Sequence, residues 1–208
     1  MRTEIISGQD PHGPWIALEI LIGGGLVAFP TDTVYGLGTL AFNAKAVKKI
    51  YAAKERSPEK AIPVLLGEVK HLAKVSQAVP EMALKLAERF WPGPLTLIVP
   101  KHPRIPHAVS STPTVGVRIP DHPVARALLV LSGPLAVTSA NLSGQPAPST
   151  AQEVLEQLGG RIAAILDGGR TPGGLASTVV DCTGVEPVIL REGPVTLKQI
   201  RDALATKS

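Results

Sequence analysis

Cysteine is nearly absent from this 208-residue sequence, and the single residue, Cys182, excludes both a disulfide framework and a zinc site built from several thiolates. Aromatic residues amount to 3%, too few for a single-stranded RNA platform of stacked rings. The five histidines lack paired metal-ligand spacing, and no nucleophile elbow of the form G-x-S-x-G occurs. Neither a long uninterrupted apolar run nor an export signal is evident, so we expect a cytoplasmic protein without a membrane span.

The remaining composition is that of a folded domain. Hydrophobic residues make up 44% of the chain and charged residues 18%, which excludes intrinsic disorder. The net charge of +4 and the pI near 9.3 favour anionic partners, without separating a nucleotide from a nucleic acid. No repeat and no linker-like segment divides the sequence, so we predict one domain over residues 1–208.

Short apolar, β-branched runs alternate with amphipathic runs, a pattern typical of an α/β fold. The pattern predicts strands at Leu26–Pro30, Ile62–Leu66, Leu95–Val99, Thr114–Ile119, Leu135–Thr138, Ile162–Leu166, Thr178–Asp181 and Val188–Leu190. It predicts helices at Trp15–Ile22, Ala44–Ala53, Glu81–Phe90, Val124–Leu131, Ala151–Leu158 and Leu197–Leu204. Because the helices do not separate every strand, we expect a mixed sheet flanked by helices rather than a regular βαβ array.

Polar clusters directly follow two of the apolar strands. Residues 29–38, Phe-Pro-Thr-Asp-Thr-Val-Tyr-Gly-Leu-Gly, put Thr31 and Asp32 in a glycine-punctuated turn. Residues 134–144 bring Ser139 and Asn141 to the end of a second strand. Hydroxyls and amides at strand ends are typical of the ligand crevices of α/β folds, and they serve equally as turn caps. From these residues alone, both interpretations stay open.

A cationic segment, Lys54-Glu55-Arg56-Ser57-Pro58, follows the second predicted helix. Proline disfavours helical geometry at the residue before it, so the helix is expected to end before Pro58. If the exit is extended, Lys54 and Arg56 project from the same side and form a phosphate clamp. The alternative, which is the more common arrangement, is that both cations complement the dipole at the helix C-terminus.

Three further features are candidates for the same site or for inert positions. The glycine-rich residues 167–178 resemble a phosphate-binding loop in composition, but they match neither the P-loop nor the dinucleotide-binding pattern. Arg118 and Arg191 each end an apolar strand and could face a common cleft, although such arginines are usually surface residues. Cys182 lies in a β-type run, where a buried inert thiol is expected.

Taken in order, the spaced motifs resemble those of the YrdC/Sua5 family over about residues 10–205. The motifs are P-T-D-T-V-Y-G-L-G at 30–38, K-x-R at 54–56, W-P-G-P at 91–94, V-R-I-P at 117–120, S-x-N at 139–141, D-G-G at 167–169, S-T-V-V-D at 177–181 and L-R-E-G-P at 190–194. The resemblance implies a single-domain twisted mixed sheet flanked by helices, with a deep basic cleft. The chain resembles the short form of the family, without the C-terminal domain of its longer members.

The resemblance also implies an activity. Members of the family form L-threonylcarbamoyladenylate and pyrophosphate from L-threonine, bicarbonate or carbon dioxide, and ATP, for the threonylcarbamoyl modification of adenosine 37 in tRNA. Mg²⁺ accompanies the nucleotide, and no metal-binding residue is expected in the protein. The implied partners are these substrates and the downstream tRNA threonylcarbamoyltransferase machinery, with weak binding of tRNA itself and no membrane.

The resemblance assigns the site residues by their matching positions. The residues matching the signature tetrad, expected to surround the ATP phosphates and to act in catalysis, are Lys54, Arg56, Ser139 and Asn141. Thr114 and Arg191 match nucleotide-contacting positions. The residues matching threonine-binding positions are Thr31, Arg118 and Ser177, with Arg118 expected to bind the carboxylate.

The chemistry implied by the resemblance requires cations, because an anionic carbamate must approach an anionic α-phosphate. We therefore expect Lys54, Arg56, Arg191 and Mg²⁺ to supply the electrostatic stabilisation, with no protein nucleophile or general base. The glycine-rich residues 168–174 are a candidate lid that excludes water. Two positions depart from the family pattern: Leu66 stands where some members carry a threonine-binding histidine, and Ala147 where some carry a serine near the nucleotide.

Three other interpretations were weighed against this one. A double-stranded RNA- or tRNA-binding module of the same fold, without synthase activity, would use the basic charge for phosphate contacts. The carbamoyl-transfer domain of hydrogenase maturation proteins is related, but those chains carry acylphosphatase and zinc-finger segments for which 208 residues with one cysteine leave no room. A paralogue of other function would be expected to lose the tetrad, which this sequence keeps.

Overall fold

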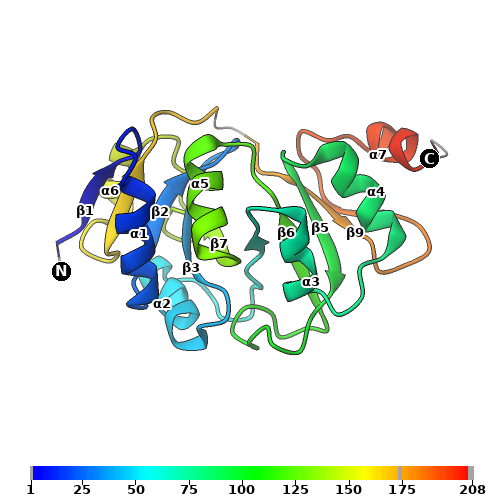
Figure 1. Ribbon diagram of the computed structural model, residues 1–208, viewed down its shortest axis with the longest axis horizontal. Coiled ribbons are helices and arrows are strands. Elements are labelled where there is room, and N and C mark those ends of the chain that lie inside the picture. The colour runs from blue at the N-terminus through cyan, green and yellow to red at the C-terminus, as the bar shows by residue number, and fades with distance from the viewer. Residues whose placement is uncertain (1, 173–174, 206–208) are drawn as a thin grey trace.

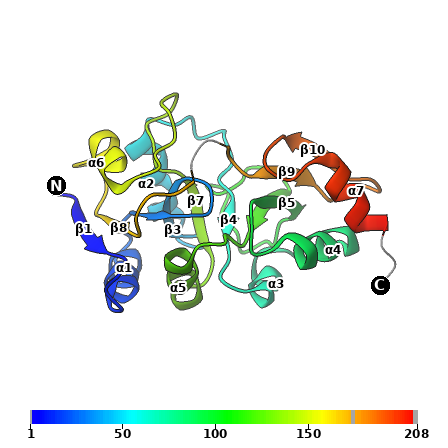
Figure 2. The ribbon, with the colours of Figure 1, turned by 90° about the horizontal axis from the view of Figure 1, so that it is seen from above.

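The computed structural model describes residues 2–172 and 175–205. Within these ranges the backbone forms one ten-stranded sheet with helices on both faces (Figures 1 and 2). Its strands are β1 (Glu4–Ser7), β2 (Val27–Pro30), β3 (Tyr35–Leu40), β4 (Val64–Leu65), β5 (Leu95–Pro100), β6 (Thr114–Arg118), β7 (Leu135–Ser139), β8 (Ala164–Asp167), β9 (Thr178–Asp181) and β10 (Val188–Arg191). The helices are α1 (Gly13–Ile22), α2 (Ala44–Lys54), the 3-10 turn η1 (Val69–His71), α3 (Leu72–Val75), α4 (Glu81–Phe90), α5 (Pro123–Ser132), α6 (Ala151–Leu158) and α7 (Leu197–Ala205).

The strands run across the sheet in the order β1-β8-β2-β3-β7-β4-β6-β5-β9-β10. The pairs β1–β8, β4–β6 and β5–β9 are parallel, whereas β2–β3, β3–β7 and β5–β6 are antiparallel. The expectation of a mixed sheet flanked by helices is therefore confirmed. This order brings strands that are far apart in the sequence to the middle of the sheet, where their ends can share a site.

Side chains are buried on both faces of the sheet, because successive residues of a strand point to opposite faces. In β2, Val27 and Phe29 pack in a cluster with residues of α1 and α5, whereas Ala28 belongs to a second cluster that includes residues of α2 and α6. Successive side chains of a strand point to opposite faces, so a strand covered on both sides is apolar throughout. Figure 2 shows α1 and α5 on one side of the sheet and α2 and α6 on the other.

The helices begin and end where local chemistry supplies partners for the backbone. The side chain of Asn43 accepts a hydrogen bond from the Ala46 backbone N–H at 3.1 Å and caps α2. The hydroxyl of Thr150 accepts one from the Glu153 N–H at 3.2 Å and caps α6. Both caps satisfy N–H groups that have no partner inside the helix. Among the described helices, none is both long enough and apolar enough to cross a bilayer.

All eight predicted strands and all six predicted helices have counterparts in the structure, with ends that move by a few residues. Two strands were missed. β1 is a short edge strand, and β3 begins at Tyr35 inside the segment that was interpreted as one glycine-rich turn. Only residues 31–34 form the turn itself, because Gly36 and Gly38 lie in β3 and pair with Phe29 and Val27.

The exit from α2 also differs from the extended geometry considered above. The helix continues through Lys54, and Glu55 then adopts the left-handed conformation, with φ of 53°. The Arg56 N–H returns to the carbonyl of Tyr51 at 3.0 Å, which closes the helix C-terminus. Lys54 therefore points into the protein from the last helical turn, while Arg56 leaves the helix in a new direction.

Candidate active site

One cavity, of about 430 Å³, collects most of the predicted site residues. Its walls include parts of strands β3, β5, β6, β7, β9 and β10, so segments separated by more than a hundred residues meet there. The predicted residues that line it are Thr31, Arg56, Arg118, Ser139, Ser177 and Arg191. The convergence that the sequence motifs implied is therefore present in the fold.

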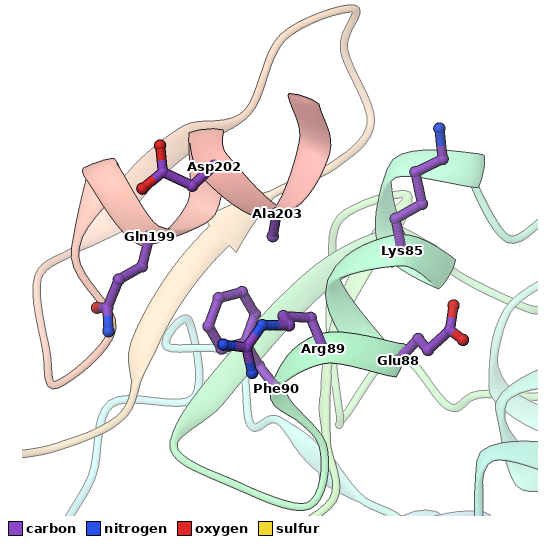
Figure 3. Close-up of a pocket in the computed structure, with 7 residues that line it drawn as sticks. All are labelled: Lys85, Glu88, Arg89, Phe90, Gln199, Asp202 and Ala203. Atoms are coloured by element: carbon purple, nitrogen blue, oxygen red, sulfur yellow. The ribbon is translucent and has the colours of Figure 1, made fainter. Parts of the chain in front are cut away.

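Two other cavities contain none of the predicted residues. Figure 3 shows one of about 560 Å³ between α4 and α7, where the ring of Phe90 lies under the Arg89 guanidinium. Another, of about 860 Å³, lies near the start of α2 and includes Phe42 and Lys45. Both exceed the candidate site in volume. We select the site by its chemistry rather than its size, because only the smaller cavity gathers arginines and hydroxyls from so many strands.

Lys54 joins the K-x-R segment to the S-x-N segment. Its side chain is 1% exposed, and its ammonium donates hydrogen bonds to the carbonyls of Ser139 and Asn141. Burial, followed by the charge of Arg56, lowers the pKa of Lys54 to about 8. Lys54 does not itself line the cavity, so in this structure it holds the end of β7 in place rather than facing a ligand.

Arg56 is the member of the pair that faces the cavity. Its Nη2 donates to the carbonyls of Lys60 at 3.4 Å and Ala61 at 3.1 Å, which fixes the guanidinium against residues 60–61. Its Nε is buried and finds no acceptor within the described residues. A buried donor without a partner is unfavourable in the protein alone, and an anionic ligand would satisfy it.

Arg118 is held at three points. Its Nε donates to the carbonyl of Gly93 at 2.9 Å, its Nη1 donates to the hydroxyl of Thr33 at 3.3 Å, and its Nη2 donates to a carboxylate oxygen of Asp32. Burial lowers the pKa of Arg118, and the charge of Asp32 opposes that shift. The Gly93 contact also explains the W-P-G-P motif, which supplies a backbone acceptor to the arginine of V-R-I-P.

Thr31 lies in the turn between β2 and β3, next to Arg118. Its hydroxyl donates to the Val34 carbonyl at 2.7 Å and lies 3.0 Å from the hydroxyl of Thr33. Because the Thr31 proton is engaged, the Thr33 hydroxyl is the donor of that second bond and accepts from Arg118. The threonines of P-T-D-T-V-Y are thus oriented by a continuous chain of hydrogen bonds.

Ser177 and Arg191 form another part of the cavity wall. Arg191 donates to the Ser177 carbonyl from Nε at 3.0 Å and from Nη2 at 2.7 Å, and Nη2 also lies 3.0 Å from the Ser177 hydroxyl. That hydroxyl lies 2.8 Å from the hydroxyl of Thr96 on β5. Burial lowers the pKa of Arg191. Arg191 therefore orients Ser177 while it faces the cavity.

Besides Lys54, two predicted residues lie outside the cavity lining. Asn141 lies outside the cavity lining, and its amide nitrogen donates to the carbonyls of Leu142 and Gln145, each at 2.8 Å. Thr114 begins the strand whose Gly116 and Arg118 line the cavity, but Thr114 itself does not line it. Their expected contacts with the nucleotide stay predictions.

The two departures from the family pattern have different positions. Leu66 is fully buried in the core, and its neighbour Leu65 lines the cavity instead, whereas Ala147 does line it. Of the candidate lid 168–174, Gly173 and Gly174 lie outside the described residues. Gly169 accepts a hydrogen bond from the Tyr35 hydroxyl at 2.7 Å, and the lid stays a prediction.

The cavity is cationic. Three arginines line it, and none of its described lining residues is an aspartate or a glutamate. No group of three or more histidine, cysteine or carboxylate side chains that could hold a metal ion occurs among residues 2–172 and 175–205. The arrangement suits an anionic ligand, and a cation such as Mg²⁺ fits there as part of a metal–phosphate complex rather than in a cage of protein carboxylates.

Sequence reasoning assigned no role to three residues of the site. Asp32 and Thr33 stood in a motif that was singled out, but their contact with Arg118 joins residues 85 and 86 positions apart. Thr96 gave no signal, because it lies within an otherwise apolar strand.

Cys182 is buried as expected, and burial raises the pKa of its thiol to about 12.

Comparisons with known proteins point to one family. The family model Sua5/YciO/YrdC, described as "Telomere recombination", matches residues 19–193. The chain is 46% identical over 201 residues to the threonylcarbamoyl-AMP synthase of Bacillus subtilis, covering 95% of this chain and 58% of that protein. It is 39% identical to the putative threonylcarbamoyl-AMP synthase of Mycobacterium tuberculosis, with coverage of 97% and 95%.

A solved structure agrees with this similarity. The crystal structure of Pyrococcus abyssi Sua5 complexed with L-threonine matches with a TM-score of 0.93 and 42% identity, covering 98% of this chain and 61% of that one. The chain thus spans about three fifths of the length of the Bacillus and Pyrococcus relatives. Both the sheet and the motifs that build the cavity lie within the shared part.

Proposed function

The chain belongs to the Sua5/YciO/YrdC family, and we propose that it forms threonylcarbamoyl-AMP and pyrophosphate from L-threonine, bicarbonate or carbon dioxide, and ATP. The observation that carries the proposal is the cationic cavity in which the threonine-binding and nucleotide-binding motifs of that resemblance meet. Relatives named threonylcarbamoyl-AMP synthase support it, as does the L-threonine bound to the Pyrococcus protein. The reaction is a nucleotidyl transfer.

In the proposed reaction, the neutral amine of threonine adds to carbon dioxide, forms an N–C bond, and gives a carbamate anion after releasing one proton to solvent. A carbamate oxygen attacks the α-phosphorus of ATP, the bond to the bridging oxygen of the leaving group breaks, and its electron pair departs with pyrophosphate. When bicarbonate is the source of carbon dioxide, one water is released. No side chain needs to form a covalent bond, so the protein acts by proximity and by charge.

The residues divide the work between the amino acid and the phosphates. The guanidinium of Arg118 binds the threonine carboxylate, and the hydroxyls of Thr31 and Ser177 contact the rest of the amino acid. Arg56 and Arg191 face the phosphates, whose negative charge grows as pyrophosphate leaves. Lys54 acts through Ser139, because it holds the end of β7 from behind the cavity wall. Mg²⁺ enters with ATP as part of the substrate complex.

The product is a labile mixed anhydride, so we propose that a transferase acting on tRNA consumes it. We further propose a cytoplasmic setting, because the reaction uses ATP and serves tRNA. A double-stranded RNA-binding module of the same fold is the weaker alternative. Such a module reads phosphates along an extended basic surface, whereas three arginines of this chain, Arg56, Arg118 and Arg191, converge at a cavity sized for small molecules.

The test is to incubate the purified chain with MgATP, carbon-13 bicarbonate and either threonine or serine, and to identify the adenylate by mass spectrometry. We expect a threonine-dependent adenylate that carries the label, with pyrophosphate in equal amount. The Arg56→Ala variant serves as the impaired control. Threonine-independent ATP consumption, or no labelled adenylate, would contradict the proposal, and a steep salt dependence of tRNA binding without turnover would favour the RNA-binding alternative.

A further inference from the structure

Asp32 stands beside the cavity without lining it. Its side chain is 13% exposed, and one oxygen, Oδ1, accepts hydrogen bonds from Arg118 Nη2 and from the Asp121 backbone N–H at 3.1 Å. Its other oxygen, Oδ2, is buried and accepts none within the described residues. The carboxylate therefore joins the β2–β3 turn, which carries Thr31, to the exit from β6, which carries Arg118.

The guanidinium of Arg118 has five N–H groups, and the protein engages three of them. The acceptors are the Gly93 carbonyl at Nε, the Thr33 hydroxyl at Nη1 and Asp32 at Nη2. One N–H therefore remains on each terminal nitrogen, in a side chain that lines the cavity. A guanidinium binds a carboxylate best when two of its N–H groups meet the two carboxylate oxygens, so orientation as well as charge decides how well Arg118 binds one.

Asp32 is the single charged residue among the three acceptors that hold Arg118, which we call the Arg118 clamp. Gly93 and Thr33 offer neutral acceptors, which hold a guanidinium less strongly than a carboxylate does. Arg191 also acts on Arg118, as a like charge that lowers the pKa of Arg118. Without Asp32, two arginines would share the cavity wall with no fixed counter-charge, and Arg118 would lose the acceptor that directs Nη2.

We propose that Asp32 is a positioning residue of the amino-acid subsite: its carboxylate fixes the orientation in which Arg118 presents two N–H groups to the carboxylate of the substrate. The proposal rests on the proposed function, because it takes the ligand of Arg118 to be an amino acid. Asp32 does not touch the substrate and takes no part in bond making.

The test compares threonine with L-threoninol, which lacks the carboxylate, by calorimetric binding, together with steady-state kinetics. For Asp32→Ala we expect the KM for threonine to rise at least about tenfold, with kcat within about threefold and the KM for ATP within about twofold. The preference for threonine over threoninol should fall by a similar factor, because threoninol makes no use of the oriented guanidinium.

Asp121→Ala is the matched control. It removes a neighbouring negative charge, while the hydrogen bond to Asp32 comes from the Asp121 backbone and persists. We expect its threonine preference to equal that of the wild type. If Asp32→Ala does not fold, Asp32→Asn carries the same test, with an expected loss of preference of about three- to tenfold, because it keeps an oxygen acceptor but loses the charge.

The outcomes separate the two proposals. A wild-type protein that forms no adenylate from threonine overturns the proposed function. A wild-type protein that forms it, together with an Asp32 variant that weakens threonine and threoninol equally, overturns the positioning role and leaves Asp32 a purely structural residue. An Asp121→Ala effect as large as that of Asp32→Ala would also overturn it, because net charge rather than the clamp would then set the affinity.

Discussion

At the scale of single residues, Lys54 makes its shortest hydrogen bonds with the backbone. The sequence left two interpretations open, a phosphate clamp and a complement to the helix dipole, and in the structure the ammonium is buried and donates to two backbone carbonyls. It thereby fixes the segment that carries Ser139. The charge serves the cavity indirectly, through the geometry of a strand end, whereas Arg56 itself lines the cavity.

Replacing Lys54 should therefore reduce stability as well as activity. In Lys54→Met the chain length is kept, but the carbonyls of Ser139 and Asn141 lose their donor. We expect the free energy of unfolding to fall by about 1–3 kcal/mol, as for buried polar groups left without partners. Urea denaturation measures it. An unchanged midpoint would mean that the ammonium is not needed to hold the end of β7.

The wild type and Lys54→Met should also differ in how their stability depends on pH. Burial lowers the pKa of Lys54 from 10.5 to about 8 in the folded protein. Between about pH 8 and pH 10.5 the unfolded chain therefore binds more protons than the folded chain. Stability relative to Lys54→Met should consequently rise with pH from about 8, by up to about 3 kcal/mol. A flat difference between wild type and variant from pH 7 to pH 10 would contradict the lowered pKa.

Arg56 should behave as a contact made in the transition state. We expect Arg56→Ala to lower kcat by roughly a hundredfold, in the range found when one stabilising charge or donor is removed. The control is Arg161→Ala, which removes a more exposed arginine paired with Glu55 at 2.7 Å and should keep kcat within about twofold. Threonine-dependent pyrophosphate release measures both. Equal rates in the two variants would remove Arg56 from the mechanism.

At the scale of elements, the last two strands close one wall of the site. Arg191 ends β10 and reaches Ser177, which directly precedes β9, and Gly193 follows β10 in close contact with the backbone of residues 176–178. A Cβ on Gly193 would lie 2.4 Å from the Thr178 nitrogen and 2.5 Å from the Ala176 oxygen. The glycine of L-R-E-G-P is therefore required by space.

We predict that Gly193→Ala separates the exit of β10 from β9. The expected loss is about 1–3 kcal/mol of unfolding free energy, typical of overpacking. A rise in the KM for threonine should accompany it, because Ser177 moves with the wall. The control is Gly184→Ala, where the nearest atom to the added Cβ is 3.7 Å away, and which should change neither quantity. If Gly193→Ala and Gly184→Ala had the same free energy of unfolding and the same KM for threonine, the steric argument would be wrong.

The elements that could be predicted are those with a clear local pattern. β9 has its predicted bounds, and α4 and α6 also match, because amphipathic periodicity and caps such as Thr150 define them locally. β3 was missed because its two glycines are typical of a turn rather than of a strand. The strand forms because β2 and β7 pair with it on either side. The helix α2 ends before Pro58 as predicted, but the extended exit that was considered is not formed, because a left-handed Glu55 is not expected from sequence.

At the scale of the whole molecule, the site depends on contacts between distant segments. Through their resemblance to a family, the motifs pointed to six residues that line the cavity, whereas Lys54, Thr114 and Asn141, which they also pointed to, do not line it. The three contacts of Arg118 and the withdrawal of Lys54 from the cavity could not be predicted, because each joins residues 25 to 87 positions apart and depends on the packing of the complete sheet.

We propose that residues 10–205 unfold as one cooperative unit, since a single sheet runs through them. The two tryptophans belong to different parts of the fold: Trp15 lies on α1 and Trp91 directly follows α4, and Figure 1 shows these two helices in different halves of the molecule. In Trp15→Phe and Trp91→Phe, fluorescence follows the remaining tryptophan during urea unfolding. We expect each signal to coincide with the circular dichroism of the same variant. Non-coincident transitions within either variant would indicate two units.

The sheet order has a consequence for synthesis on the ribosome. Thr31 and Arg118 are translated well before Ser177 and Arg191, yet all four are needed to enclose the cavity. A nascent chain that ends short of Ser177 would lack both that residue and Arg191, and it would compete poorly with the finished protein for threonine and ATP. Truncated translation products should thus be unable to sequester threonine or ATP, and they should not inhibit the finished protein.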